Sequence, residues 1–201
     1  MFKFLARYRI AISRVFALVF TFVILFCHPY FYNSLFNGVI LVLGLLLILI
    51  GMLGRIFSSL FMSDNRHKNI VSMGIYSITR NPLYLFSFIG TIGLTFVFGS
   101  FVLAGVVIVF YLLYYYIIIT FEENSLSEKF GLEYINYLQS GTPRFFPKFS
   151  LWKSDTHLNV SYKVVLQTIL DASWFFVIAI AIVVILKLQQ IGMIPVYFYL
   201  F

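Results

Sequence analysis

The chain has few charged residues and a single cysteine. Only 10% of its 201 residues are Asp, Glu, Lys or Arg, against about 25% in soluble domains, and 62% are hydrophobic. This composition excludes a soluble globular domain and indicates an integral membrane protein. Because Cys27 stands alone, no intrachain disulfide is possible. The three histidines have no metal-ligand spacing, so we expect no bound metal.

Acidic residues are scarcer than basic ones, with 7 Asp and Glu against 14 Lys and Arg. The basic residues form no long run, so we expect no nucleic-acid partner. Thirteen of the 14 fall in three polar segments, residues 1–14, 55–82 and 122–163, and only Lys187 lies elsewhere. The positive-inside rule therefore predicts that the N-terminus and these three segments face the cytosol.

Five apolar runs are long enough to cross a bilayer, which takes about 20 helical residues. They predict an all-α fold, a polytopic membrane helix bundle in one domain (1–201), with transmembrane helices at 13–32, 35–54, 83–99, 101–121 and 166–186. A cleaved signal peptide is the alternative for the first run, but that run ends in aromatic residues rather than a small-residue cleavage site. We expect the apolar tail, 189–201, to lie in the membrane interface because it is too short to span.

The third and fourth spans form a hairpin with a polar block at each end. The first block is residues 69–84, and the second begins with Glu122 and Glu123 directly after the fourth span. Carboxylates at a membrane boundary are costly unless they are paired or hydrated, which makes both acids functional candidates. A helix that simply continues into solvent is the alternative. Gly90, Gly93 and Gly99 are interpreted as small-residue packing positions in the third span.

Beyond the two acids, apolar and aromatic residues recur at three- and four-residue steps. Leu126, Phe130, Tyr134 and Tyr137 follow this spacing, which is typical of one face of an amphipathic helix. We expect this helix to lie along the cytoplasmic membrane face and to cover the site.

Together the two blocks resemble the isoprenylcysteine carboxyl methyltransferase and phospholipid methyltransferase superfamily. The shared pattern is Gly-x-Tyr-x-x-x-Arg-Asn-Pro-x-Tyr (74–84), a membrane hairpin, Glu-Glu-x-x-Leu (122–126), Phe-Gly-x-x-Tyr-x-x-Tyr (130–137) and a Pro/Arg-rich end (143–147). The core of the resemblance covers residues 69–149; the fifth span and the tail lie outside it.

The resemblance implies a membrane enzyme that uses S-adenosylmethionine as methyl donor, bound at the cytoplasmic face without a Rossmann fold. It implies a lipophilic acceptor taken from the bilayer, either isoprenylcysteine-carboxylate-like or phospholipid-like. Carried over by position, the cofactor-binding residues are Lys68, Asn69, Ile70, Val71, Tyr76, Asn81, Pro82, Leu83, Tyr84, Glu122 and Glu123; the catalytic residues are Arg80, Glu123 and Arg144; the substrate-binding residues are Tyr134 and Tyr137.

One departure from the superfamily pattern bears on the acceptor. Carboxyl-methylating members carry an Arg four residues ahead of the first Glu, and this chain has Ile118 there. The clamp expected for a carboxylate is missing at that position, and Arg80 and Arg144 are the cations that remain to replace it. An amine acceptor would need deprotonation, for which Glu123 is the candidate base. The sequence leaves O- and N-methylation open.

Two other function classes share this architecture. A membrane oxidoreductase related to the sterol reductases would use a nicotinamide cofactor, but the chain is short for that class and has no additional basic pocket for a 2′-phosphate. A non-catalytic membrane subunit is the other alternative, against which the intact Glu pair argues. The small size and the absence of retention signals favour a bacterial inner membrane. The oligomeric state stays open.

Overall fold

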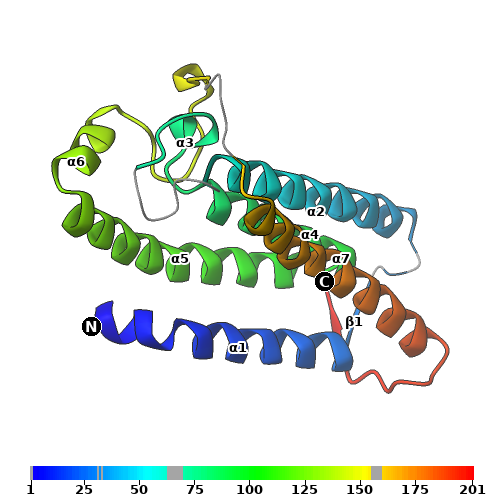
Figure 1. Ribbon diagram of the computed structural model, residues 1–201. Coiled ribbons are helices and arrows are strands. Elements are labelled where there is room, and N and C mark those ends of the chain that lie inside the picture. Colours follow the sequence, from blue (N-terminus) through cyan, green and yellow to red (C-terminus); the bar gives the residue numbers. More distant parts are fainter. Residues whose placement is uncertain (1, 31, 33, 63–69, 155–159) are drawn as a thin grey trace. The chain divides into compact units, whose positions relative to one another are not determined.

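The computed structural model describes residues 2–30, 32, 34–62, 70–154 and 160–201, with side chains from residue 14 onward (Figure 1). In this part of the chain the fold is all-α, as expected. The seven α-helices are α1 (Phe2–Phe26), α2 (Leu35–Met62), α3 (Ile75–Ile78), α4 (Pro82–Phe98), α5 (Phe101–Phe130), α6 (Leu132–Gln139) and α7 (Tyr162–Gln190). A 3₁₀ helix, η1 (Phe149–Leu151), and two short strands, β1 (Cys27–Pro29) and β2 (Phe198–Leu200), accompany them.

Three helices, α2, α5 and α7, are long and apolar enough to cross a membrane. The apolar part of α1, Arg14–Phe26, and the whole of α4 are shorter apolar helices. The chain is therefore a multi-pass membrane protein. Three of the five expected spans are present as long helices and two as shorter ones.

Several helix ends differ from the predicted ones. The second span continues past Arg55 to Met62, and the fourth continues past the Glu pair to Phe130. Both extensions stay helical because neither contains glycine or proline, and their Arg, Glu, Lys and Leu residues are good helix formers. The first helix ends at Phe26 rather than at Tyr32, because residues 27–29 are extended and pair with β2.

The chain divides into two compact units, and α2, α4, α5 and α7 each contribute to both. Unit 1 comprises residues 1–49, 90–118 and 175–201. Its buried core includes Ile48, Phe98 and Ile182. A Cβ atom on Gly93 would lie 2.7 Å from the Gly44 carbonyl oxygen, so only glycine permits this approach of α4 to α2.

The C-terminal tail is a paired part of unit 1. β1 and β2 form a parallel pair in which Cys27 lies opposite Phe198, and the Val102 amide donates to the Phe201 carbonyl oxygen (2.9 Å). The side-chain amide of Gln189 also reaches the end of α1, where it donates to the carbonyl oxygens of Ile24 (3.1 Å), Leu25 (3.0 Å) and Cys27 (3.3 Å). The backbone groups of the tail thus have partners within the protein, and its expected location in the membrane interface stays a prediction.

Unit 2 comprises residues 50–89 and 119–174 and contains α3, α6 and η1. Gly74 opens α3 with a positive φ of 57°. A Cβ atom there would lie 1.9 Å from the ring of Phe61, so the position requires glycine for both its conformation and its space.

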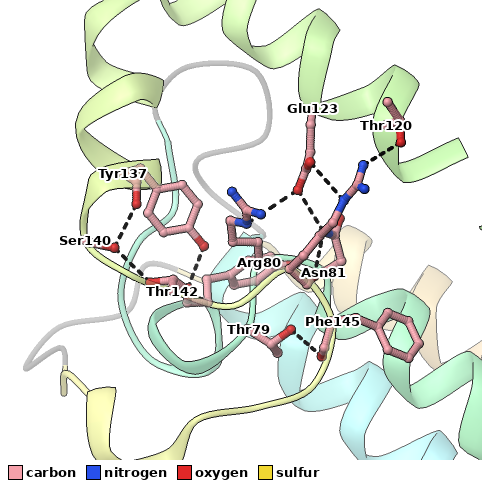
Figure 2. A network of polar contacts seen from close by, with 11 residues as sticks. Thr79, Arg80, Asn81, Thr120, Glu123, Tyr137, Ser140, Thr142 and Phe145 are labelled. Atoms are coloured by element: carbon pink, nitrogen blue, oxygen red, sulfur yellow. Dashed lines mark hydrogen bonds and ion pairs between the residues drawn. The ribbon is translucent and has the colours of Figure 1, made fainter. Parts of the chain in front are cut away.

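A second segment of unit 2, residues 142–153, lies along residues 74–81, and we call it the strap. Backbone hydrogen bonds join the two segments along their whole length. They run from Arg80 N to Pro143 O (2.9 Å), from Lys148 N to Ile78 O (2.9 Å) and from Gly74 N to Lys153 O (2.8 Å). The Thr79 hydroxyl adds a bond to the Phe145 carbonyl oxygen (2.8 Å), which Figure 2 shows. The strap is thereby fixed to the motif that precedes α4.

The expected amphipathic helix is divided into two. Gly131 has a positive φ of 51° and separates α5 from α6. Leu126 and Phe130 therefore lie at the end of α5, whereas Tyr134 and Tyr137 lie on α6 and are buried. The prediction of one helix with a continuous apolar face is therefore wrong. The four residues lie instead on the end of α5 and on a short helix, α6, with two buried tyrosines.

Candidate functional site

Glu122 and Glu123 lie in α5 within unit 2. Consecutive residues of an α-helix point about 100° apart, so the two carboxylates face different neighbours. Each of them meets a different residue of the motif at 80–84, and the two predicted blocks therefore converge at this turn of α5.

Glu123 lies between two arginines. Its Oε1 is 3.4 Å from Arg80 Nε, and its Oε2 is 3.0 Å from Arg144 Nε. The side chains of Glu123, Arg80 and Arg144 are only 16%, 17% and 27% exposed, so solvent screens these ion pairs weakly. Asn81 Nδ2 donates to the same carboxylate at 3.4 Å (Figure 2). One carboxylate and two guanidinium groups leave a local net charge of +1.

Arg144 reaches this network from the strap and is held at both ends. Its Nη2 donates to the Thr120 hydroxyl (2.6 Å), and its carbonyl oxygen accepts from Asn81 Nδ2 (2.9 Å). Thr120 was not among the predicted site residues. The sequence does contain an indication of its role, because Thr120 places a hydroxyl three residues before Glu123 in an otherwise apolar and aromatic run.

Glu122 has a different partner. The Tyr84 hydroxyl donates to its Oε1 at 2.7 Å. Tyr84 lies in the first turn of α4, which begins at the buried Pro82, where a missing N–H is tolerated. Leu83 lies in the same turn. The start of α4 thus presents a phenol to one carboxylate while Asn81, just before it, binds the other.

The two tyrosines of α6 are buried and neutral. Burial and, to a smaller extent, the negative charge of Glu123 raise the pKa of Tyr134 to about 12. Burial likewise raises the pKa of Tyr137, whose hydroxyl donates to the Tyr76 carbonyl oxygen at 2.6 Å (Figure 2). Both phenols therefore stay protonated near neutral pH, and that of Tyr137 serves as a hydrogen-bond donor. Tyr137 holds α6 against α3, and its predicted contact with substrate stays a prediction.

The remaining predicted cofactor residues lie at or before the start of the described motif. The Ile70 amide donates to Glu133 Oε1 (3.1 Å), and Val71 packs against the core of unit 2. Lys68 and Asn69 lie outside the described residues. Glu133 is a further residue that sequence reasoning missed; an acid in the first turn of α6 is its signal.

The geometry provides two chemically distinct places. The Tyr84–Glu122 pair offers a carboxylate that is hydrogen-bonded to a neutral phenol and suits an ammonium group. The Arg80–Glu123–Arg144 network offers excess positive charge and suits an anion. Within the described residues, no group of three or more His, Cys, Asp and Glu side chains is placed to hold a metal ion.

Comparison with known proteins gives a family and two relatives. The family described as "Phospholipid methyltransferase" matches residues 33–133. The chain is 29% identical to "Nickel-cobalt-cadmium resistance protein NccN" of Alcaligenes xylosoxydans xylosoxydans, over 90% of this chain and 84% of that protein. It is also 29% identical to "Cobalt-zinc-cadmium resistance protein CzcN" of Cupriavidus metallidurans, over 90% of this chain and 82% of that protein. No solved structure matches.

Proposed function

The chain belongs to the phospholipid methyltransferase family, and from this premise we propose that it transfers a methyl group from S-adenosylmethionine to a lipophilic acceptor in the membrane. One observation supports the proposal above the others. Two blocks about 40 residues apart in the sequence converge on adjacent carboxylates of α5, through Tyr84 to Glu122 and through Arg80 and Asn81 to Glu123.

We assign the amino-acid end of the cofactor to Glu122 and Tyr84. A carboxylate that already accepts a short hydrogen bond from a phenol is oriented, and it attracts an ammonium group by charge. The aromatic face of a tyrosine beside it favours a sulfonium by cation–π attraction. When bound, S-adenosylmethionine supplies an electrophilic methyl group. The residues around it position the reactants and exclude water.

We assign a positioning role to Glu123. Its carboxylate pairs with Arg80 and Arg144 at once, so it orients both guanidinium groups. In this proposal Glu123 holds the two arginines in place, and the arginines face the acceptor.

We propose that Arg144, on the strap, takes the role of the arginine that is missing at position 118. Its guanidinium lies against α5 at Thr120, about 200° around the helix from Ile118, so it would meet the acceptor from another side of α5. An acceptor with an acidic group near the reacting atom, a carboxylate or a phosphate, would find its partner there. This supports an anionic lipophilic acceptor without deciding between O- and N-methylation.

Calorimetric titration of the detergent-purified protein with S-adenosylmethionine and S-adenosylhomocysteine tests the proposal. Glu122→Gln should weaken binding at least about tenfold, while Glu128→Gln, a substitution of an exposed acid in the same helix, should leave it unchanged. If the folded wild type binds neither compound, the proposal fails. A nicotinamide titration then distinguishes an oxidoreductase related to the sterol reductases from a non-catalytic subunit.

A second proposal concerns the setting in which the chain works. Both relatives carry names that state resistance to cobalt and cadmium, with nickel in one case and zinc in the other. We propose that this chain also contributes to resistance to such cations, through methyl transfer to a membrane component. A deletion strain should grow less well in cobalt or cadmium salts, and the wild-type gene, but not Glu122→Gln, should restore growth.

We further propose the topology that the charge distribution predicts, with the N-terminus and the Glu pair in the cytosol of a bacterium and the chain in its inner membrane. Single cysteines introduced at exposed positions, such as Ser125 in α5, in a Cys27→Ser background would test it. Labelling of intact cells by a membrane-impermeant maleimide at Ser125→Cys would contradict this orientation.

A further inference from the structure

The strap carries three large aromatic side chains that are exposed. Phe146 is 69% exposed, Phe149 is 74% exposed and Trp152 is 47% exposed. They follow one another at three-residue steps, and η1 occupies residues 149–151. Because a 3₁₀ helix has three residues per turn, Phe149 and Trp152 share one face. Clustered exposed aromatic residues of this kind mark a surface that contacts something other than water.

The strap is also basic and lacks acids. Between Glu133 and Asp155 the sequence contains no Asp or Glu. Arg144 is engaged by Glu123, whereas the side chains of Lys148 and Lys153 are exposed and form no ion pair with the described residues. Aromatic residues interleaved with exposed lysines have the composition that binds at the interface of anionic membranes.

The position of Trp152 connects the strap to a spanning helix. Its ring lies parallel to that of Phe57, with centroids 6.4 Å apart and an interplanar angle of 11°. Phe57 belongs to α2, is itself exposed and follows the exposed Leu53 by one turn. The aromatic face of the strap thus continues the exposed apolar surface of a helix that crosses the bilayer, at the end of that helix.

We propose that the strap is a membrane-docking segment that binds the anionic headgroup layer. Phe146, Phe149 and Trp152 lie in the interface at the face where α2 ends, and Lys148 and Lys153 bind lipid phosphates. An amphipathic aromatic side chain such as Trp is suited to this depth. Each lysine near an anionic surface favours binding by about 1 kcal/mol, or about fivefold, and salt weakens the attraction. The proposal depends on the membrane location of the chain and not on the methyl-transfer chemistry.

Docking has a consequence for the site because the strap is joined to it. Lys148 N, in the middle of the strap, bonds to Ile78 O, and Arg144, near its start, pairs with Glu123. Contact of the strap with anionic lipid would therefore help to keep Arg144 beside Glu123 and residues 74–81 beside the strap. The aromatic and basic face of the strap is a part of the molecule that the cofactor and acceptor assignments do not use.

Tryptophan fluorescence tests the proposal directly, because the chain has only two tryptophans. Trp174→Phe leaves Trp152 as the reporter in vesicles of phosphatidylcholine, with or without phosphatidylglycerol. Bromine atoms near the headgroup should quench Trp152 more strongly than bromine atoms near the chain ends. Phosphatidylglycerol should reduce quenching by aqueous acrylamide, and Lys148→Gln with Lys153→Gln should remove this reduction.

The matched control is Trp152→Phe, which leaves Trp174 within α7. Lipid bromine should quench Trp174, and phosphatidylglycerol and the lysine substitutions should not affect it, which also shows that the variants are inserted and folded. The proposal is overturned if acrylamide quenches Trp152 fully in vesicles. That result is expected if the surface binds a soluble partner, because without the partner it would be open to water. It is also overturned if shielding of Trp152 is independent of phosphatidylglycerol and of both lysines.

Discussion

Glu122 and Glu123 are adjacent, chemically identical residues, and the structure predicts opposite consequences for their substitution. Glu122→Gln should weaken cofactor binding strongly and leave stability nearly unchanged. Glu123→Gln should lower stability and weaken cofactor binding much less. The reason is that Glu122 meets a neutral phenol, whereas Glu123 meets two guanidinium groups.

The expected magnitudes follow from the contacts. Two unit charges about 4 Å apart attract by about 4 kcal/mol at an effective dielectric constant of about 20. Desolvation and the residual exposure of Arg80 and Arg144 offset much of this, since exposed pairs contribute only about 0–1 kcal/mol. We therefore expect Glu123→Gln to lower the free energy of unfolding by about 2 kcal/mol, which corresponds to about 4–8 °C in Tm.

For Glu122 the loss is one charge-assisted interaction with the cofactor. Such bonds contribute about 1.5–3 kcal/mol, so Kd should rise about 10- to 150-fold in Glu122→Gln. Thermal unfolding in detergent measures the first effect and calorimetry the second, with Glu128→Gln as the control for both. A double-mutant cycle of Glu123→Gln with Arg144→Gln should show a coupling of about 1–2 kcal/mol. Equal loss of cofactor binding in Glu122→Gln and Glu123→Gln, with unchanged Tm, would refute the division of roles.

Three further outcomes are expected. Gly74→Ala should lower Tm far more than Gly131→Ala, because both positions have positive φ but only the first lacks space for a Cβ atom; equal losses would contradict this packing. The raised pKa of Tyr134 means that the folded state keeps a proton that the unfolded state releases above pH 10, so stability should fall between about pH 10 and 12. This fall, measured by thermal unfolding against pH, should be smaller in Tyr134→Phe. Gln189→Leu should lower stability by about 1–3 kcal/mol by leaving carbonyl oxygens at the end of α1 without donors, while Gln190→Leu at an exposed position should have little effect.

The sequence predicts the convergence of the two blocks well, because it depends on a simple geometric rule. A hairpin of two spans brings its outer ends to the same membrane face, so Asn81 and Tyr84 lie near Glu122 and Glu123. The identity of each pairing was not predictable in the same way. Which of two adjacent acids receives the arginines depends on the rotation of α5, which the uniformly apolar run before it does not indicate.

Other features leave little trace in the sequence. The strap is joined to residues 74–81 mainly by backbone groups, which every residue has, so composition says nothing about their partners. The division of the expected amphipathic helix at Gly131 was missed because the three- and four-residue spacing runs through it. A glycine inside a helical pattern is compatible with a continuous helix and with a break, and the positive φ of Gly131 shows that the helix breaks here.

The pairing of β1 with β2 has a consequence for how the protein is made. The end of the first helix depends on groups that follow it by more than 160 residues, through Gln189 and the tail. During synthesis the carbonyl oxygens at the end of α1 therefore have no protein donor until Gln189 and residues 198–200 have been made. Contacts between such distant residues also form late, because closing a long loop costs entropy. Until then the first helix is in the membrane without its final partner, and a chain shortened by only a few residues would leave its first span, not merely its last, incompletely assembled.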